Sequence, residues 1–336
     1  MEQGENKIGD STVSVFERIE ECRLCQGREI VEILDFGDTP IADILCDFAE
    51  EDVLKVPLTL GICVACSLVQ ILETIQPEIV FNEHYPYYSS VSPKLMEYFK
   101  SSALHIIEKY KLNNHHSVIE IGSNDGYMLR YFKEKGITTL GIDLSGPALS
   151  AQKQGIQTLM EFFSKELATV ISEKYNEGFD ILLANNVIAH DANINGIIEG
   201  ISLVLNDQGA AVIEVPYVID LISKNEFDTI YHQHIFYYSL TSLDYAFRKY
   251  SLYINHVEHT SFHGGTLRLY IEKKKSPSES VYELLANERS LGVDNLSYYQ
   301  SFHDKVTKVK TDINQLLHVL KKNGKRVAGY GAAQRR

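Results

Sequence analysis

The sequence is poor in the features that mark several large classes of protein. Its 336 residues include only eight prolines and five cysteines, and 44% are hydrophobic and 23% charged, which excludes a disordered chain, a collagen-like fibre and a disulfide scaffold. No apolar run approaches the roughly 18 residues of a membrane-spanning helix, and residues 1–10 lack the apolar stretch of a signal peptide. Acidic residues outnumber basic ones, 45 to 32, and the net charge of −13 repels phosphate backbones. We therefore expect neither a membrane nor nucleic acid as a partner.

Strands and helices alternate through the middle of the chain. After Ser92, a good N-cap, and Pro93 at the first helical position, apolar residues repeat at helical spacing as far as Tyr110. Buried strands are then expected at Ser117–Ile121, Thr138–Ile142, Ile156–Leu159, Phe179–Ala184 and Gly209–Val215. Helices are expected between them at Tyr127–Lys135, Gly146–Gln154 and Ile194–Leu205. This alternation predicts an α/β fold with a doubly wound, mostly parallel sheet covered on both faces.

Two Cys-x-x-Cys pairs lie before this sheet, in residues 1–75, which we expect to form a small β domain. The pairs are Cys22/Cys25 and Cys63/Cys66. Four soft thiolates suit tetrahedral zinc and close a structural site with no position left for water, although two pairs of core cysteines or one redox pair are alternatives. Cys46 is expected to be a small buried hydrophobe. Paired cysteines of this kind also indicate a reducing, cytoplasmic location.

The segment after the sheet reads differently. We assign residues 76–235 to the sheet domain and 236–336 to a C-terminal part that opens with a β-rich segment at His256–Lys273. A long helical region is expected at Ser278–Asn323. The sequence then ends with Lys325–Ala333, where we expect a strand followed by a Gly-rich turn. New βαβ domains begin in this way, so we expect an incomplete C-terminal α/β domain.

A Gly-rich turn follows the first strand of the predicted sheet, where doubly wound sheets bind ligands. The residues expected to bind a cofactor there are Glu120, Gly122, Asn124, Asp125 and Gly126. Their Gly-x-x-x-Gly spacing differs from a dinucleotide loop, and the acidic side chains suit a ligand with an ammonium and a sulfonium group. Asp143 ends the second strand and can accept both hydroxyls of an adenosine ribose. The pattern resembles the S-adenosylmethionine site of class I methyltransferases, with an NAD loop as the rival.

Two further polar segments come directly after the fourth and fifth strands. The first contains Asn185 and Asn186, expected to face the cofactor, and His190. The second is the run Tyr231-His232-Gln233-His234. Both fall where substrates meet cofactors in an open α/β sheet, whereas a second metal site made by two histidines at i, i+2 spacing has little support.

Taken in order, these motifs resemble one family. They are the two cysteine pairs, a Tyr-rich loop with Tyr85 and Tyr87, the Glu-x-Gly-x-Asn-Asp-Gly loop, Asn-Val-x-Ala-His, Tyr-His-x-His and the run His263–Arg268. The chain is similar over nearly its whole length to the zinc-containing sugar C-methyltransferases. The resemblance implies a class I methyltransferase fold, zinc, S-adenosylmethionine and a nucleotide-sugar substrate methylated at C3 of a 4-keto-deoxysugar.

The resemblance also implies roles for individual residues. His234 would be the base that removes a proton next to the ketone, since an imidazole with a pKa near 6.5 suits neutral pH. His190, Tyr231 and Tyr85 or Tyr87 would position the sugar and its carbonyl. The enolate formed would then attack the sulfonium methyl group in line.

Two departures from the family pattern keep other readings open. Gln233 is counted among the candidate catalytic residues, but it replaces a glutamate that family members carry, and an amide cannot shuttle a proton. Family members also continue into a full C-terminal domain, so we expect a truncated product or a fragment. The alternatives are a catalytically impaired remnant that binds S-adenosylmethionine and zinc, an O- or N-methyltransferase and, with least support, an NAD-dependent oxidoreductase.

Overall fold

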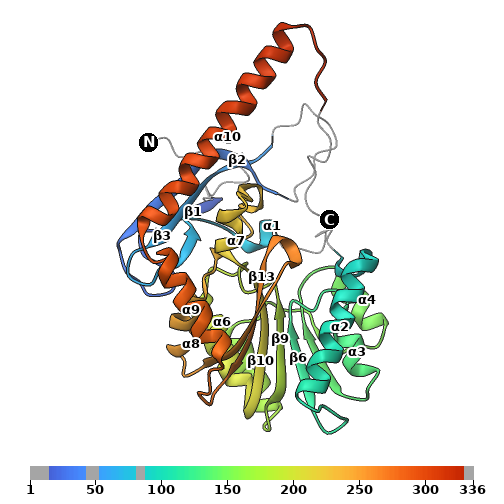
Figure 1. Cartoon of the computed structure of the whole chain (residues 1–336). Helices are drawn as coiled ribbons and strands as arrows, with labels where there is room; N and C mark the ends of the chain where they lie inside the picture. The colour runs from blue at the N-terminus through green and yellow to red at the C-terminus, as the bar shows by residue number, and fades with distance from the viewer. Residues whose placement is uncertain (1–14, 43–52, 81–87, 329–336) are drawn as a thin grey trace, which may run out of the picture.

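The structure, a computed structural model, describes residues 15–42, 53–80 and 88–328. Figure 1 shows a large central sheet with helices on both sides, a smaller sheet at its upper end and one long helix that leaves the body of the molecule. Among the described residues, no helix combines the length and the apolar character that crossing a bilayer requires.

The central sheet has seven strands in the order β12-β13-β10-β9-β6-β7-β8. In chain order they are β6 (Ser117–Ile121), β7 (Thr138–Ile142), β8 (Thr158–Leu159), β9 (Phe179–Asn185), β10 (Leu205–Pro216), β12 (Tyr253–Thr260) and β13 (Thr266–Glu272). Strands β10, β9, β6, β7 and β8 run parallel, while β13 is antiparallel to both its neighbours. The predicted α/β sheet is confirmed, and it extends past residue 235 because β12 and β13 complete one edge.

Alternation along β9 divides the core between the two faces of the sheet. Ile181 and Leu183 pack in one apolar cluster and Leu182 in another, because successive side chains of a strand point to opposite faces. Helices α2 (Pro93–Lys109) and α3 (Leu129–Lys133) cover the first face, and α5 (Lys165–Lys174) and α6 (Ile194–Val204) cover the second. The remaining helix beside β7 and β8 is α4 (Pro147–Lys153). As predicted, α2 begins after Ser92, whose Oγ accepts the backbone N–H of Leu95 at 3.4 Å.

A second, four-stranded sheet has the order β11-β4-β3-β2. Its strands are β2 (Ile30–Pro40), β3 (Lys55–Cys63), β4 (Val69–Ile71) and β11 (Phe236–Tyr237). Beside it, β1 (Phe16–Arg18) pairs with β5 (Glu73–Ile75), followed by α1 (Pro77–Val80). Helices α7 (Val218–Ser223) and α10 (Leu296–Lys322) bury apolar side chains in its core. The sheet of the N-terminal domain is therefore completed by β11, a strand from the segment that follows the predicted catalytic residues.

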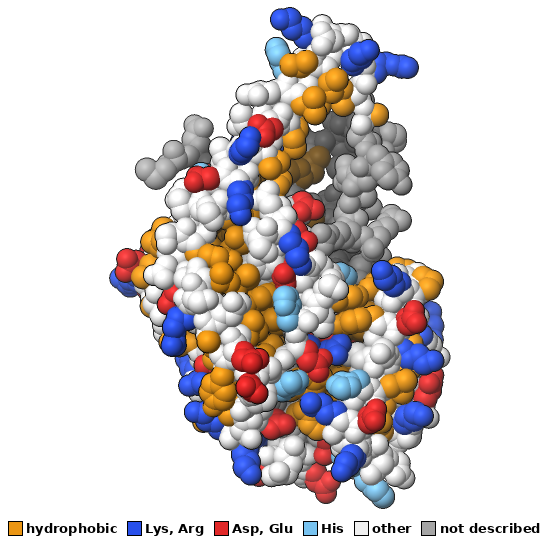
Figure 2. Space-filling view, viewed as in Figure 1, with side chains coloured by type: hydrophobic (Ala, Val, Ile, Leu, Met, Phe, Trp, Pro, Cys, Tyr) orange, Lys and Arg blue, Asp and Glu red, His pale blue; other side chains and the backbone are white. Residues whose placement is uncertain are grey.

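Helix α10 leaves the body of the molecule along its second half (Figure 1). Figure 2 shows apolar side chains along this projecting part, between scattered basic and acidic ones. The exposed apolar residues there are Ile313, Leu316, Leu317 and Val319.

Several elements differ from the sequence prediction. The helical region expected at Ser278–Asn323 consists of two helices, α9 (Glu279–Leu291) and α10. Helix α9 ends because Gly292 adopts a left-handed conformation, with φ of 71°. The strand expected from Lys325 is wrong for residues 325–328, which form no regular element and have no neighbouring strand with which to pair in the described chain. Residues 329–333 of that prediction lie outside the described residues, as does Cys46.

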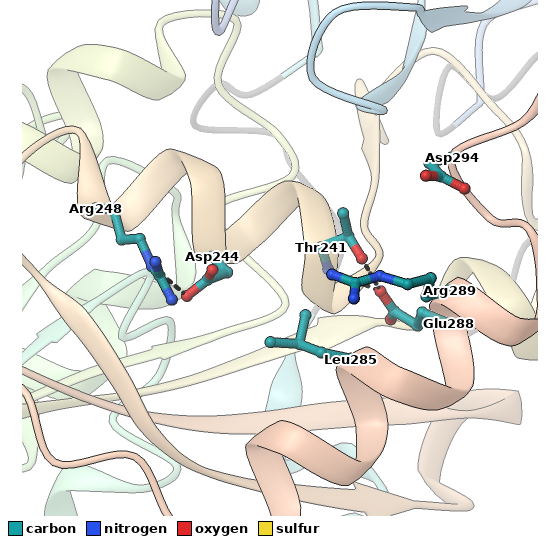
Figure 3. A pocket seen from close by; sticks show the side chains of 7 residues that line it. All are labelled: Thr241, Asp244, Arg248, Leu285, Glu288, Arg289 and Asp294. Atoms are coloured by element: carbon teal, nitrogen blue, oxygen red, sulfur yellow. Dashed lines mark hydrogen bonds and ion pairs between the residues drawn. The ribbon is translucent and has the colours of Figure 1, made fainter.

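A pocket of about 290 Å³ between α8 (Leu240–Arg248) and α9 is structural in character (Figure 3). The fully buried carboxylate of Glu288 accepts the N–H groups of Leu240 and Thr241 at 2.7 and 2.8 Å, and the hydroxyl of Tyr217 at 3.0 Å. It thereby satisfies the first N–H groups of α8, where a negative charge is favoured.

Candidate active site and zinc centre

The loop after β6 has a backbone that only a few residue types can adopt. Gly122, Asn124 and Gly126 have positive φ angles of 67°, 46° and 74°. A Cβ on Gly122 would lie 2.7 Å from Cγ2 of Val187, and one on Gly126 would clash with Ile156. Glycine is therefore required at both positions, and asparagine is one of the few other residues that tolerate such a conformation. The loop lies at the carboxyl end of the sheet, where the strand order reverses between β7, β6 and β9.

Asp143 holds this loop from the end of β7. One carboxylate oxygen accepts the backbone N–H of Asn124 at 2.8 Å, and the other accepts the N–H of Ser145 at 2.7 Å together with the Ser145 hydroxyl. A carboxylate oxygen has two lone pairs, so the oxygen that accepts from Asn124 alone can still accept a ligand hydroxyl. The structure thus brings Asp143 to the donor loop, and its contact with a ribose stays a prediction.

Glu120 is fully buried beneath the loop. Burial raises the pKa of its carboxyl to about 8, although hydrogen bonds from Tyr127 and Asn185 oppose the shift. The Nδ2 of Asn185 lies 3.4 Å from Glu120 Oε1 and 3.3 Å from the Tyr127 hydroxyl. Oε2 of Glu120 has no hydrogen-bond partner within the described residues. A carboxylate in this position costs free energy until a cation or a donor reaches it.

Two more buried oxygens near these strand ends share that property. Oδ1 of Asp125 and Oδ1 of Asn186 are buried and have no donor among the residues that the structure describes. Asn186 has a positive φ of 54°, and its N–H donates to the carbonyl of Glu214 at 2.8 Å. Unsatisfied acceptors on both sides of one loop fit a ligand that carries N–H donors and positive charge, as the ammonium and sulfonium groups of S-adenosylmethionine do, and they do not fit a diphosphate.

The predicted catalytic histidines lie close to the donor loop, because the N–H of His190 donates to the carbonyl of Val187, whose side chain packs against Gly122. The hydroxyl of Tyr231 and Nε2 of His234 are 2.9 Å apart, and the rings of His234 and His190 have centroids 4.8 Å apart. Nδ1 of His190 donates to the carbonyl of Gln233 at 2.8 Å, and burial lowers the pKa of His190. The two segments are also joined by the N–H of Ile235, which donates to the carbonyl of Ala189 at 2.8 Å. Because its pKa is lowered, His190 is a neutral imidazole at neutral pH. Tyr231 and His234 each keep part of their side-chain surface exposed to solvent.

The residues between Tyr231 and His234 are directed to the N-terminal domain. His232 is buried, and its Nε2 donates to the carbonyls of Val56 and Pro57 at 3.2 and 3.1 Å. Gln233 is also buried, and its Nε2 donates to the carbonyl of Ala42 at 3.2 Å. An ionised glutamate at this position could not make this last bond, because its carboxylate would place an acceptor against a carbonyl oxygen. The predicted catalytic role of Gln233 stays a prediction, and the structure gives its amide a structural contact.

Tyr85 and Tyr87 lie outside the described residues. The chain that follows them reaches the donor loop, since the N–H of Ser89 donates to Oδ1 of Asn124 at 2.9 Å.

Sequence reasoning did not identify one buried polar network near the site. Arg268 Nε donates to Glu214 at 2.7 Å, and the hydroxyl of Tyr98 lies 3.0 Å from both Arg268 and Glu214. Burial alone would lower the pKa of Arg268, but Glu214 raises it, and burial together with Glu214 raises the pKa of Tyr98 to about 12. The ring of Tyr98 stacks on Phe262 with centroids 3.8 Å apart. Two residues in the sequence could have indicated this network: Glu214, near the end of the fifth predicted strand, and Arg268, in the His263–Arg268 run.

The four cysteines converge as predicted. The sulfur atoms of Cys22, Cys25, Cys63 and Cys66 all lie within 4.8 Å of one another. Burial raises the pKa of Cys63 to about 11, whereas the hydrogen bond from Cys66 lowers that of Cys22 to about 5, so the four cannot all ionise without a cation. Four such sulfur ligands fit tetrahedral zinc in a closed, structural site. This is the one cluster of metal-ligating side chains within residues 15–42, 53–80 and 88–328.

The fold and the donor site define a class I S-adenosylmethionine-dependent methyltransferase that also holds zinc. Family models match three successive parts of the chain: a zinc binding domain at residues 22–81, a methyltransferase domain at 93–257 and a C-methyltransferase C-terminal domain at 261–336. The choice between a methyl donor and a nicotinamide dinucleotide is therefore settled for S-adenosylmethionine.

The chain belongs to the zinc-containing sugar C-methyltransferase family. It is 31% identical over 324 residues to the C-methyltransferase NovU of Streptomyces niveus, a match that covers 94% of this chain and 76% of that protein. Solved structures are more distant. Magnesium protoporphyrin IX methyltransferase of Synechocystis PCC 6803 is 13% identical with a TM-score of 0.42, covering 53% of this chain and 83% of that one. A methyltransferase of Clostridium acetobutylicum is 10% identical with a TM-score of 0.41, covering 54% and 92%.

Proposed function

We propose that this protein transfers a methyl group to the carbon next to the ketone of a nucleotide-linked 4-keto-deoxysugar, with His234 as the base. The observation that supports the proposal most strongly is the grouping of Tyr231, His234 and His190 close to the donor loop and its unsatisfied acceptors. A nucleotide sugar is also the substrate that the family resemblance implies. We place the enzyme in the cytoplasm, where such substrates and reduced cysteines occur together.

The proposed chemistry needs little more than a base, a carbonyl contact and alignment. S-adenosylmethionine, when bound, supplies a methyl group already activated by sulfonium. His234 would take the proton from the carbon next to the ketone, and the electron pair would pass to the carbonyl oxygen as an enolate. Tyr231, which now contacts Nε2 of His234, can turn its hydroxyl to that oxygen and stabilise the charge. Glu120 and Asp143 would hold the donor at the loop after β6.

Proton removal can be measured without methyl transfer. The zinc-loaded protein is incubated in deuterium oxide with a panel of nucleotide-linked 4-keto-deoxysugars, and exchange at the carbon next to the ketone is followed by NMR. We expect exchange with the natural chain and a loss of about 100-fold or more in His234→Asn, since general-base catalysis contributes typically 10²–10⁴-fold. His303→Asn is the matched control, because that histidine lies in α10 and contacts the Ile33 carbonyl of β2.

The outcomes separate the alternatives. Exchange that survives unchanged in His234→Asn would remove this residue as the base. Donor binding with neither exchange nor transfer on any sugar would favour the impaired remnant suggested by Gln233. Transfer to a hydroxyl or amine without carbon exchange would indicate an O- or N-methyltransferase.

A further inference from the structure

The side chain of Gln70 links the zinc centre to the N-terminal sheet. It is fully buried in β4, and its Nε2 donates to Sγ of Cys22 at 3.2 Å. Its Oε1 accepts from Nη1 of Arg23 at 3.1 Å. Both ends of the amide are therefore held by the first cysteine knuckle. A zinc-bound cysteine is a thiolate, and donors of this kind orient the ligands of a metal.

The backbone of the same residue contacts β11, the strand that follows residues 231–234. These four residues are called the catalytic segment. Gln70 lies opposite Phe236 in the antiparallel ladder of β4 and β11, and the N–H of Ile71 donates to the carbonyl of Ile235 at 2.8 Å. Strand β11 has only two residues, so few hydrogen bonds fix its position. The Arg23 guanidinium, 5.9 Å from the centroid of the Phe236 ring, adds a contact from the knuckle itself.

The catalytic segment, with the adjoining Ile235, makes hydrogen bonds to both the N-terminal domain and the methyltransferase domain. On one side His232 donates to the carbonyl of Pro57 in β3. On the other side, the N–H of Ile235 donates to the carbonyl of Ala189, the residue directly before His190. The ring of His234 therefore takes its position from the N-terminal sheet as well as from the methyltransferase sheet.

We propose that Gln70 is a positioning residue through which the zinc centre sets the placement of the catalytic segment. The donor loop is built on β6 and β7, which pair with neither β4 nor β11. Weakening the Gln70 link therefore lowers the rate of methyl transfer and leaves donor affinity unchanged. The effect on rate rests on the proposed function of His234, whereas the effect on the segment's position does not.

The test compares Gln70→Met, which keeps the volume and removes both polar ends, with the control Thr59→Val. Thr59 is buried in the neighbouring strand β3 and accepts from Arg18, without contact to the cysteines. With zinc held saturating, we expect Gln70→Met to raise the amide hydrogen exchange rate of residues 231–238 about tenfold. We expect the same variant to lower kcat about tenfold. KM for the donor and its affinity by calorimetry should not change, and Thr59→Val should match the natural chain.

Two further measurements do not depend on activity, and the second uses the natural chain, so it does not depend on how well a variant folds. In cobalt-substituted protein, the thiolate-to-metal absorption band should shift in Gln70→Met and not in Thr59→Val. Removing zinc from the natural chain with a chelator should speed exchange of residues 231–238 more than that of residues 117–143. Unchanged exchange in residues 231–238 after zinc removal and in Gln70→Met would overturn the proposal. Failure to transfer methyl by the natural chain would instead count against the proposed function, because exchange uses no substrate.

Discussion

Replacing Glu120 by glutamine should make the free protein more stable and its donor site worse. The fully buried carboxyl has a pKa of about 8, raised by burial from its usual 4.5, and one of its oxygens has no partner within the described chain. Glutamine has the same shape and no charge to desolvate. The natural residue is therefore kept at a cost to stability, as expected for a group that meets a cation.

The magnitude follows from the two pKa values. A group whose pKa is raised in the folded state contributes stability that is present at low pH and is lost as pH rises toward the folded value. Between pH 5 and pH 7 the unfolded Glu120 ionises while the folded one keeps its proton, which costs about 1.4 kcal/mol per pH unit. Over that interval the natural chain should lose about 2.5 kcal/mol relative to Glu120→Gln.

Denaturant unfolding of both zinc-loaded proteins at pH 5 and pH 7, without donor, measures this difference. Glu134→Gln removes the same charge from an exposed position and should show no such pH-dependent gain. Calorimetry should show S-adenosylmethionine binding about 10- to 100-fold more weakly to Glu120→Gln, the loss of a charged hydrogen bond. Affinity of the natural chain should rise with pH up to about 8. A Glu120→Gln protein that is less stable at pH 7, or that binds the donor equally well, would refute the reasoning.

Three other substitutions, one of them with a matched control, have defined outcomes. Asp143→Asn should weaken donor binding about 10- to 100-fold by calorimetry, and an unchanged affinity would remove the ribose contact. Cys22→Ser should lose zinc by atomic emission and about 3–5 kcal/mol of stability in the N-terminal lobe, whereas retained metal would contradict the ligand set. Arg268→Met leaves the Glu214 carboxylate buried and unpaired, so unfolding free energy should fall by about 3–5 kcal/mol. Arg248→Met, at a half-exposed ion pair, should cost less than about 1 kcal/mol, and equal losses would argue against the buried network.

The sheet, the donor loop and the zinc ligands could be predicted because each leaves a local pattern. Buried strands alternate with helices at regular spacing, and the turn after β6 needs Gly122 and Gly126 for steric reasons that their spacing reveals. The cysteine pairs are chemically specific whatever the length of chain between them. In each case a few neighbouring residues carry the information.

What was missed depends on contacts between distant segments. The sequence cannot show that His232 and Gln233 turn to the N-terminal domain while His234 does not. Their partners Pro57 and Ala42, and the strand β4 that pairs with β11, lie more than 150 residues away in the chain. Strand pairing likewise brings β12 and β13 into the central sheet. Residues 325–328 form no strand for the same reason, since a strand exists only where another can pair with it.

The central claim is that a methyl group is delivered to carbon next to a ketone. The direct measurement incubates the zinc-loaded protein with S-adenosylmethionine labelled with ¹³C in its methyl group and with nucleotide-linked 4-keto-deoxysugars, followed by carbon NMR of the product. The account predicts a labelled methyl bonded to C3 of the sugar ring. Label found on oxygen or nitrogen, or left entirely on the bound donor, would contradict it.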